Sequence, residues 1–359
     1  MRIATFNTEN LFSRAKVLNF KNNAEGDKLL AKIAILQDLL EANIYDKTKI
    51  LSLYKELKDY IEIAEERGKL FSRSGFAIKG IKANGAADWD GSIIFKRDKF
   101  SDTTRTNTAT VLKKLNSDIC CLVEVEGRDV LSSFNSEMLG LSKFPYNISI
   151  DGNDDRGIDI GLLSKYPIKN IRTHIFDKEK PTSRGYIFSR DCLEVELEIN
   201  PTKSLHVLCN HLKSKGYSTS QAGSDNRRKL QAASIKKILA ANYDLKKDLV
   251  IVIGDFNDTP ESNPLQELLS TPNLYDVLHL QFKNDVQQRW TYHYNKLFQI
   301  DYILVSKPMK DLFIQAGVER RGIFDIEKLS GGLVKPFKGI TASSNAASDH
   351  GAVWAEFNL

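Results

Sequence analysis

Short apolar runs recur along most of this chain, and stretches with helical periodicity separate several of them. A run of five to nine mostly apolar residues, bounded by polar turns, predicts a strand that is buried on both faces. Helical spacing of apolar residues predicts helices at 104–116 and 227–243. Strands that alternate with helices in this way predict a layered α/β architecture. The predicted strands lie at residues 2–6, 118–126, 146–150, 158–164, 192–199, 205–211, 249–255, 300–306 and 352–357.

The pattern changes between the first two strands. Within residues 26–67, one apolar series has Leu29, Ile33, Leu36 and Leu40, and a second has Ile50, Leu53, Leu57 and Ile61. Both series place their apolar side chains on one helical face, so we expect two amphipathic helices. Residues 68–92 are rich in Gly, Ala and Ser and are predicted to form a loop.

The composition and net charge of the chain are compatible with several functions and do not identify one. The chain has 359 residues and a net charge of +5, from 51 basic and 46 acidic side chains. This mild excess suits a polyanionic partner and equally suits none. No apolar run approaches the about 20 residues of a membrane span. The start of the chain lacks the features of a signal peptide, so we expect a cytoplasmic protein as written, or a secreted one if a leader was removed.

The predicted strands end at polar residues that can bind a metal or a phosphate. The four cysteines, Cys120, Cys121, Cys192 and Cys209, are not among them and are expected to be small buried side chains. Carboxylate, amide and imidazole groups suit a hard cation such as Mg²⁺ or Mn²⁺ better than a zinc-thiolate centre. The polar residues at the strand ends are Asn7, Glu124, Asn210, His211, Asp255, Asn257, Asp258, Asp301, Asp349 and His350.

A family resemblance rests on seven motifs that occur in a characteristic order. They are TFNTENLF, VEVE, GIDIGLLSKYPI, NHLKSKG, GDFND, QIDYILVS and SDH. In this order they resemble the endonuclease/exonuclease/phosphatase superfamily. The resemblance implies a four-layer α/β sandwich, with two mixed β-sheets face to face and helices outside. We expect one catalytic domain over residues 1–359, with a helical insertion at about 12–100, and a phosphodiesterase that depends on Mg²⁺ or Mn²⁺.

The resemblance also implies roles for individual residues. Glu124 would bind the metal, with Asn7 as a neutral oxygen donor and Asp349 as a further contact. Asp255 would orient or deprotonate the attacking water, and the amide of Asn257 would hold that water or a phosphate oxygen. His350 would contact the scissile phosphate and His211 would lie on its other side. Asp301 would accept a hydrogen bond from His350, at about 2.6–3.2 Å between heavy atoms.

A nucleic acid is the favoured substrate, with DNA ahead of RNA, because NHLKSKG and RGIDIGLLS resemble the bacterial nuclease branch of this superfamily. Two alternatives stay open. The first is a phosphatase or a phospholipase C-like esterase that uses the same site. The second is a binding protein on an inactive scaffold, which the complete set of site residues disfavours. The residues expected to contact substrate are Arg156, Arg190, Asn210, Lys213 and Lys215, with Arg227 and Arg228 also placed on loops around the mouth of the site.

Overall fold

The strands and helices of the chain belong to two separate units. The computed structural model describes residues 1–11, 16–18, 23–96, 103–154, 156–183, 185–215 and 221–359. The larger unit comprises Met1–Phe12 and Phe100–Leu359, and the smaller unit comprises Ser13–Lys99. The smaller unit is therefore inserted directly after the first strand of the larger one.

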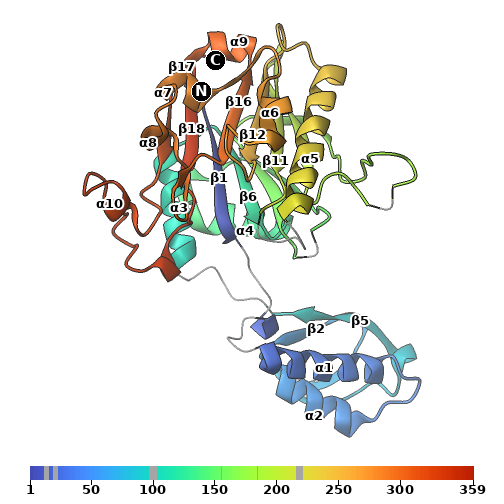
Figure 1. The fold of residues 1–359 in the computed structure, drawn as a ribbon. Coiled ribbons are helices and arrows are strands. Elements are labelled where there is room, and N and C mark those ends of the chain that lie inside the picture. The colour runs from blue at the N-terminus through green and yellow to red at the C-terminus, as the bar shows by residue number, and fades with distance from the viewer. Residues whose placement is uncertain (12–15, 19–22, 97–102, 155, 184, 216–220) are drawn as a thin grey trace. The chain divides into compact units, whose positions relative to one another are not determined.

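Two mixed sheets form the centre of the larger unit, and each has six strands among the described residues (Figure 1). Each sheet has one pair of parallel neighbours near its middle, and the remaining pairs are antiparallel. The first sheet has the order β17 (Phe313–Glu319), β18 (Ala352–Phe357), β1 (Arg2–Leu11), β6 (Ile119–Val125), β8 (Asp159–Ser164) and β7 (Tyr146–Ile150). The second has the order β13 (Leu274–Asp276), β16 (Asp301–Ser306), β12 (Val250–Asp255), β11 (Lys203–His211), β10 (Cys192–Asn200) and β9 (Ile168–Arg172).

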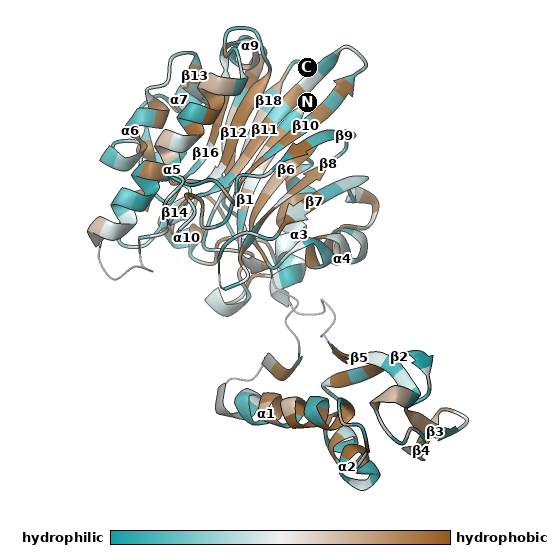
Figure 2. Cartoon of the chain, turned by 90° about the vertical axis from the view of Figure 1, so that its right-hand side faces the viewer, coloured by the Kyte–Doolittle hydropathy of each residue, from teal (hydrophilic) through white to brown (hydrophobic). Residues whose placement is uncertain are grey.

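Both faces of each sheet are covered, which explains why the strands are continuous apolar runs in the sequence. Ile3 and Val123 of the first sheet pack against Val207 and Ile253 of the second in one core between the sheets. The outer face of the first sheet packs on α3 (Thr103–Leu115) and α4 (Arg128–Met138). The outer face of the second packs on α5 (Gln221–Asn242) and α6 (Asn263–Leu269). The predicted four-layer sandwich is confirmed, and Figure 2 shows its apolar strands.

Shorter elements complete the larger unit. They include the hairpin β14 (Tyr292–His293) and β15 (Leu297–Phe298), which leads into β16. All four cysteines are buried and unpaired, as predicted. None of the described helices combines the length and apolar character that crossing a membrane requires. The other short elements are α7 (Val277–Phe282), α8 (Val286–Arg289), α9 (Lys307–Asp311), α10 (Ile326–Leu329) and the 3₁₀ turns η3 (Gly140–Ser142) and η4 (Ser343–Asn345).

The smaller unit corrects the prediction of a helical insertion. Its first helix, α1 (Asn23–Leu40), buries the predicted apolar face, but α2 (Lys47–Leu57) ends before Ile61. Residues Ile61–Gly68 form strand β2, whose alternating side chains Ile61 and Ile63 are buried. The predicted loop at 68–92 contains a hairpin and most of a further strand. The smaller unit also has η1 (Lys16–Leu18), β3 (Phe71–Ser74), β4 (Ala77–Ile81), η2 (Ala86–Asp88) and β5 (Trp89–Phe95), which pairs with β2.

These errors have a common physical reason. A spacing of four residues from Leu57 to Ile61 suits a helix, but Ile61 and Ile63 also fit a strand with a spacing of two. The strand forms because Ile63 pairs with Ile93, thirty residues further on in the chain. A local sequence pattern gives no information about that contact. Sequence periodicity therefore located the core positions of the second helix and missed its end.

Candidate active site

A pocket of about 590 Å³ lies where polar residues from both sheets meet. This volume is in the range of small-molecule sites, about 300–1,000 Å³. The family resemblance assigned catalytic or metal-binding roles to eight residues. Six of them line the pocket, and His211 and Asp301 contact lining residues from behind it. The lining residues are Asn7, Glu9, Glu124, Ser214, Lys215, Asp255, Asn257, Thr259, Tyr292, Tyr294, Asn295, Phe298, Ile300, Asp349 and His350.

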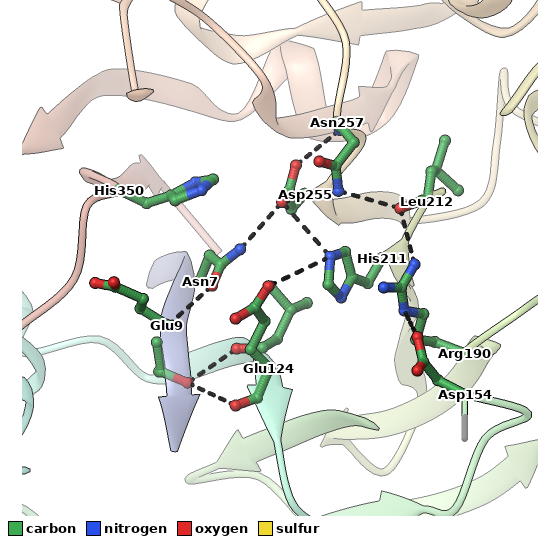
Figure 3. A network of polar contacts seen from close by, with 12 residues as sticks. Asn7, Glu9, Glu124, Asp154, Arg190, His211, Leu212, Asp255, Asn257 and His350 are labelled. Carbon is green, nitrogen blue, oxygen red and sulfur yellow. Dashed lines mark hydrogen bonds and ion pairs between the residues drawn. The ribbon is translucent and has the colours of Figure 1, made fainter. Parts of the chain in front are cut away.

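Asp255, at the end of β12, is held by amide groups on two sides (Figure 3). The side-chain nitrogen of Asn7 donates to its Oδ2 at 3.1 Å, and Asn257 donates to the same oxygen at 3.1 Å. The backbone nitrogen of Asn257 donates to Oδ1 at 2.7 Å. Burial, and then the charge of Asp301, raise the pKa of Asp255 well above the usual range of a carboxyl. The carboxylate is therefore fixed in direction and more basic than an exposed aspartate.

Gly254 allows this placement. Its φ is +133°, and a Cβ added there would lie 1.9 Å from the backbone oxygen of Asn210 on the neighbouring strand. Any other residue would push β12 away from β11. The glycine of the GDFND motif thus brings Asp255 beside His211, with which it is paired in the sheet register.

His350 and Asp301 form the predicted contact. Nδ1 of His350 lies 2.9 Å from Oδ2 of Asp301, and both side chains are buried. Burial alone would lower the pKa of His350, but the charge of Asp301 and its hydrogen bond raise that pKa well above the usual value of a histidine. The ring of Tyr292 packs on the imidazole, with 4.9 Å between centroids. The geometry stabilises a positively charged imidazole at the wall of the pocket.

His211, at the end of β11, is the opposite case. Its Nε2 lies 3.7 Å from Oδ2 of Asp255 and 3.9 Å from Oε1 of Glu124. Burial, and then the nearby charge of Arg190, lower the pKa of His211 well below the usual value. The site therefore pairs a neutral imidazole at the end of β11 with a charged one just before β18.

Three carboxylates face the pocket near the end of β6 and the start of β18. Glu124 and Asp349 were predicted, whereas Glu9 was missed although it stands in the TFNTENLF motif. Oε2 of Glu9 accepts a hydrogen bond of 3.0 Å from the backbone nitrogen of Asp349. Burial and the charge of Asp349 raise the pKa of Glu9 to about 7. Burial also raises the pKa of Glu124, although the charge of His350 opposes the rise.

This carboxylate group fits a divalent cation. The charge of Asp349 contributes to the raised pKa of both Glu9 and Glu124, so the group has a local excess of negative charge that a bound cation would neutralise. Glu124, Asp349 and Glu9 would supply carboxylate oxygens, with the amide of Asn7 beside them. A second cluster, Asp255, Asp301 and His350, has ligand atoms within 4.8 Å of one another. In this cluster Nδ1 of His350 already contacts Oδ2 of Asp301 at 2.9 Å.

The predicted phosphate contacts are mostly paired with acids. Asp154 accepts two hydrogen bonds from Arg156, each 3.0 Å, and its Oδ2 lies 2.9 Å from Nε of the buried Arg190. Nζ of Lys215 lies 2.7 Å from Oδ1 of Asp258, and this lysine lines the pocket. Lys213 is half-buried, and burial followed by the charge of Arg190 lowers its pKa.

Two further predictions about substrate contacts are wrong, and so is the placement of Arg227 on a loop. Asn210 alternates with His211 along β11, is fully buried, and donates 3.0 Å to the backbone oxygen of Leu208. Side chains of adjacent strand residues point to opposite faces, so Asn210 points away from the side on which His211 contacts Asp255 of the pocket. Arg228 lies on α5 rather than on a loop, is fully buried, and pairs with Asp258 at 3.0 Å. It supports the GDFND turn from behind. Arg227 is half-buried on the same helix and donates to the backbone oxygen of Tyr186.

An aromatic wall, defined as Tyr292, Tyr294 and Phe298, was also missed. It comes from the hairpin β14–β15 and lines the pocket. Tyr294 at the turn is 77% exposed. One sequence feature could have revealed these residues: the segment WTYHYNKLF, directly before the QIDYILVS motif, is rich in aromatic side chains. Alternating aromatic residues on both sides of a short polar turn indicate a hairpin.

The comparisons with known proteins identify the family. The model of the Endonuclease/Exonuclease/phosphatase family matches residues 96–350. This chain belongs to that family, which confirms the resemblance carried by the sequence motifs. A solved structure of humanized TDP2 from D. rerio has the same fold, with a TM-score of 0.50 and 16% identity, and covers 72% of this chain and 92% of that one.

Curated relatives include two sphingomyelinases of Leptospira interrogans. Sphingomyelinase C 1 is 25% identical over 202 residues, which is 49% of this chain and 33% of that protein. Sphingomyelinase C 2 is 23% identical over 186 residues, covering 46% of this chain and 29% of that protein. The match thus accounts for about a third of the length of these relatives.

Proposed function

We propose that this chain hydrolyses phosphodiester bonds of nucleic acids with the help of a divalent cation, Mg²⁺ or Mn²⁺. One observation carries the proposal. A fixed basic carboxylate, a charged imidazole, a neutral imidazole and a group of three carboxylates surround one pocket of suitable size. These are the groups that attack of water on a phosphodiester requires.

The residues of the chain divide the chemistry between them. Asp255, held by Asn7 and Asn257, takes a proton from the attacking water as the oxygen–phosphorus bond forms. His350, kept charged by Asp301, binds a phosphate oxygen whose negative charge grows during attack. Neutral His211 donates a hydrogen bond on the other side of the phosphate. A cation bound by the three carboxylates would neutralise charge on a nonbridging oxygen.

The aromatic wall favours a nucleic acid. Tyr294 is exposed at the mouth of the pocket, and Tyr292 and Phe298 continue the wall inward. Bases stack on such side chains with little sequence preference, at about 1–3 kcal/mol per base. Lys215 also lines the pocket and adds a positive charge to it. The arrangement suits a phosphate with an aromatic group on at least one side.

The sphingomyelinase relatives favour a second candidate, a phospholipase C-like esterase. Its substrate would be a lipid whose phosphodiester links a headgroup to an apolar body. The same catalytic groups would serve, because they act on the phosphodiester and not on its substituents. The aromatic wall would then contact the headgroup or the interface of the bilayer.

One panel of substrates separates these candidates. Pure protein would be incubated with plasmid, linear duplex, single-stranded DNA, RNA, sphingomyelin vesicles and a chromogenic diester, in Mg²⁺, Mn²⁺ or EDTA. We expect cleavage of a nucleic acid that EDTA abolishes and that Asp255→Asn lacks. Rapid hydrolysis of sphingomyelin with no cleavage of DNA or RNA would contradict the nuclease proposal and support the phospholipase C-like esterase. Binding without hydrolysis of any substrate would favour an inactive scaffold.

A further inference from the structure

The smaller unit presents a strongly basic hairpin that the proposed chemistry does not use. We define it as residues 67–82, which include strands β3 and β4. All five of its charged residues are basic, and all five are exposed. They are Arg67, Lys69, Arg73, Lys79 and Lys82. A chain whose overall excess is only +5 therefore concentrates positive charge in sixteen residues.

An aromatic side chain stands at the tip of this hairpin. Phe76 has a relative exposure of 104%, so its ring contacts essentially nothing in the chain. Gly75, with φ of +58°, makes the turn that presents it. At the other end of the hairpin, Phe71 and Ile81 face each other across the strands and are buried in the core of the unit. The base of the hairpin is therefore packed in the core of the smaller unit, and its tip is exposed to solvent.

Most of the positive charge is available to a partner. Glu65 on β2 lies 3.0 Å from Arg73 and 3.8 Å from Lys69, so one carboxylate serves two cations. Among the described residues, Arg67, Lys79 and Lys82 form no ion pair, although Arg67 stands opposite Asp90 in the register of β2 and β5. The hairpin thus keeps at least three cations that form no ion pair, in addition to the exposed ring at its tip.

We propose that the basic hairpin is a second docking surface for nucleic acid, separate from the catalytic pocket. Cations bind phosphates and an exposed ring stacks on a base, which is the combination that single-stranded nucleic acids require. An anionic membrane is disfavoured, because one ring between Ser74, Gly75 and Ala77 offers little apolar area for insertion. The choice of nucleic acid as the polyanion rests on the proposed function. The excess of positive charge on the hairpin is an observation that does not depend on that function.

Binding of labelled oligonucleotides to the full-length protein tests the charges. Fluorescence anisotropy would be recorded in EDTA, so that hydrolysis does not interfere, with single-stranded DNA, RNA and duplex at several salt concentrations. Lys79→Ala with Lys82→Ala should weaken binding about tenfold or more at low salt. It should also flatten the log–log salt slope by about 1.4–1.8, or about 0.7–0.9 for each lost phosphate contact. The matched control is Lys28→Ala with Lys58→Ala, which removes two exposed lysines outside the hairpin.

The ring is tested separately. Phe76→Ala should weaken binding of single strands more than of duplex, whereas Ile44→Ala, at a residue 85% exposed in the same unit, should have no effect. In Phe76→Trp, added nucleic acid should quench the new fluorescence, whereas insertion into anionic vesicles would shift it to shorter wavelengths. Hydrolysis of the chromogenic diester should be unchanged in every variant, because no catalytic residue is altered.

Each result decides for or against the hairpin. Equal loss in the hairpin and control variants, wild-type binding in the hairpin variants, or binding only to vesicles would overturn the proposal. The first two outcomes would leave the proposed nuclease reaction untouched. Conversely, hairpin-dependent binding without metal-dependent cleavage would support the docking surface and overturn the proposed reaction alone.

Discussion

His174, at the edge of the second sheet, is held between two carboxylates, and its replacement by glutamine should destabilise the protein in a pH-dependent way. Its Nε2 lies 2.5 Å from Oε1 of Glu194 and its Nδ1 lies 2.7 Å from Oδ2 of Asp177. Tyr243 also donates to Glu194, and Arg172 lies 3.6 Å from the same carboxylate. Because the backbone nitrogen of His174 donates to Asp191, this cluster also fixes the segment that ends at Arg190.

The size of the effect follows from burial. The side chains of His174 and Glu194 are 9% and 6% exposed, so their charge-assisted contact contributes about 1.5–3 kcal/mol. Asp177 is 43% exposed, and solvent screening limits its contribution to about 0.5–1 kcal/mol. His174→Gln should therefore lower the free energy of unfolding by about 2–4 kcal/mol. For a unit of this size that is a fall in Tm on the order of 10 °C.

The sign of the pH dependence comes from two opposite shifts. Burial alone would lower the pKa of His174, but the two carboxylates raise it above 6.5. Burial alone would raise the pKa of Glu194, but His174 and Tyr243 lower it below 4.5. The histidine contribution is complete below pH 6.5 and is lost as the pH rises through its folded pKa. The glutamate contribution is complete above pH 4.5 and is lost as the pH falls through its folded pKa.

Thermal unfolding of the two proteins across pH 4–9 measures this dependence. The difference in Tm between wild type and His174→Gln should be largest between about pH 4.5 and 6.5 and should shrink at higher pH. His206→Gln is the control, since the ring of His206 packs on Tyr243 and, among the described residues, forms no ion pair. A Tm difference that is the same at pH 5.5 and pH 8.5 would refute the ion-pair reasoning.

Three further predictions concern the pocket. Asp301→Asn keeps the shape but removes the charge that holds His350, so kcat should fall about 10²–10⁴-fold with little change in KM; a loss confined to KM would count against this role. Glu124→Gln should raise the Mg²⁺ or Mn²⁺ concentration needed for half-maximal activity, and turnover that persists in EDTA would contradict a metal-assisted reaction. Lys213→Ala with Lys215→Ala should raise KM for DNA or RNA more than for a chromogenic diester, and equal loss on both would place these lysines at the scissile phosphate.

The sequence predicted those features that depend on local pattern. Strands such as β6 and β12 are continuous apolar runs because both of their faces are buried, and such runs are visible without any knowledge of pairing. Asp255 is the last residue of β12 and Asn257 lies two residues further on, so their position at the sheet edge was predictable from the end of the run. The contact between Asp301 and His350 was predictable only from the family resemblance, because the two residues are 49 positions apart.

Features that depend on long-range pairing were not predictable in this way. Arg190 was expected to contact substrate, but Asp154 from another loop engages its guanidinium. Asn210 was misplaced because adjacency to His211 in sequence means the opposite face in a strand. Glu9 became visible as a site residue only when the fold brought Asp349 to it across the first sheet. In each case the missing information was which segment lies opposite, and local pattern does not report it.

The backbone of the pocket argues that its side chains serve function. Glu9, Glu124 and Asn257 have φ values of +45°, +64° and +56°, a region that favours glycine. Holding a non-glycine residue there costs about 1–3 kcal/mol, which the surrounding structure must offset. Glycine would relieve that cost at each position and would still allow the turn. Two carboxylates and an amide stand there instead. These three are half of the six non-glycine residues with a positive φ among the described residues, and all three line one pocket. A scaffold that only bound a partner would have no need for these three side chains at strained positions, and this disfavours the inactive alternative.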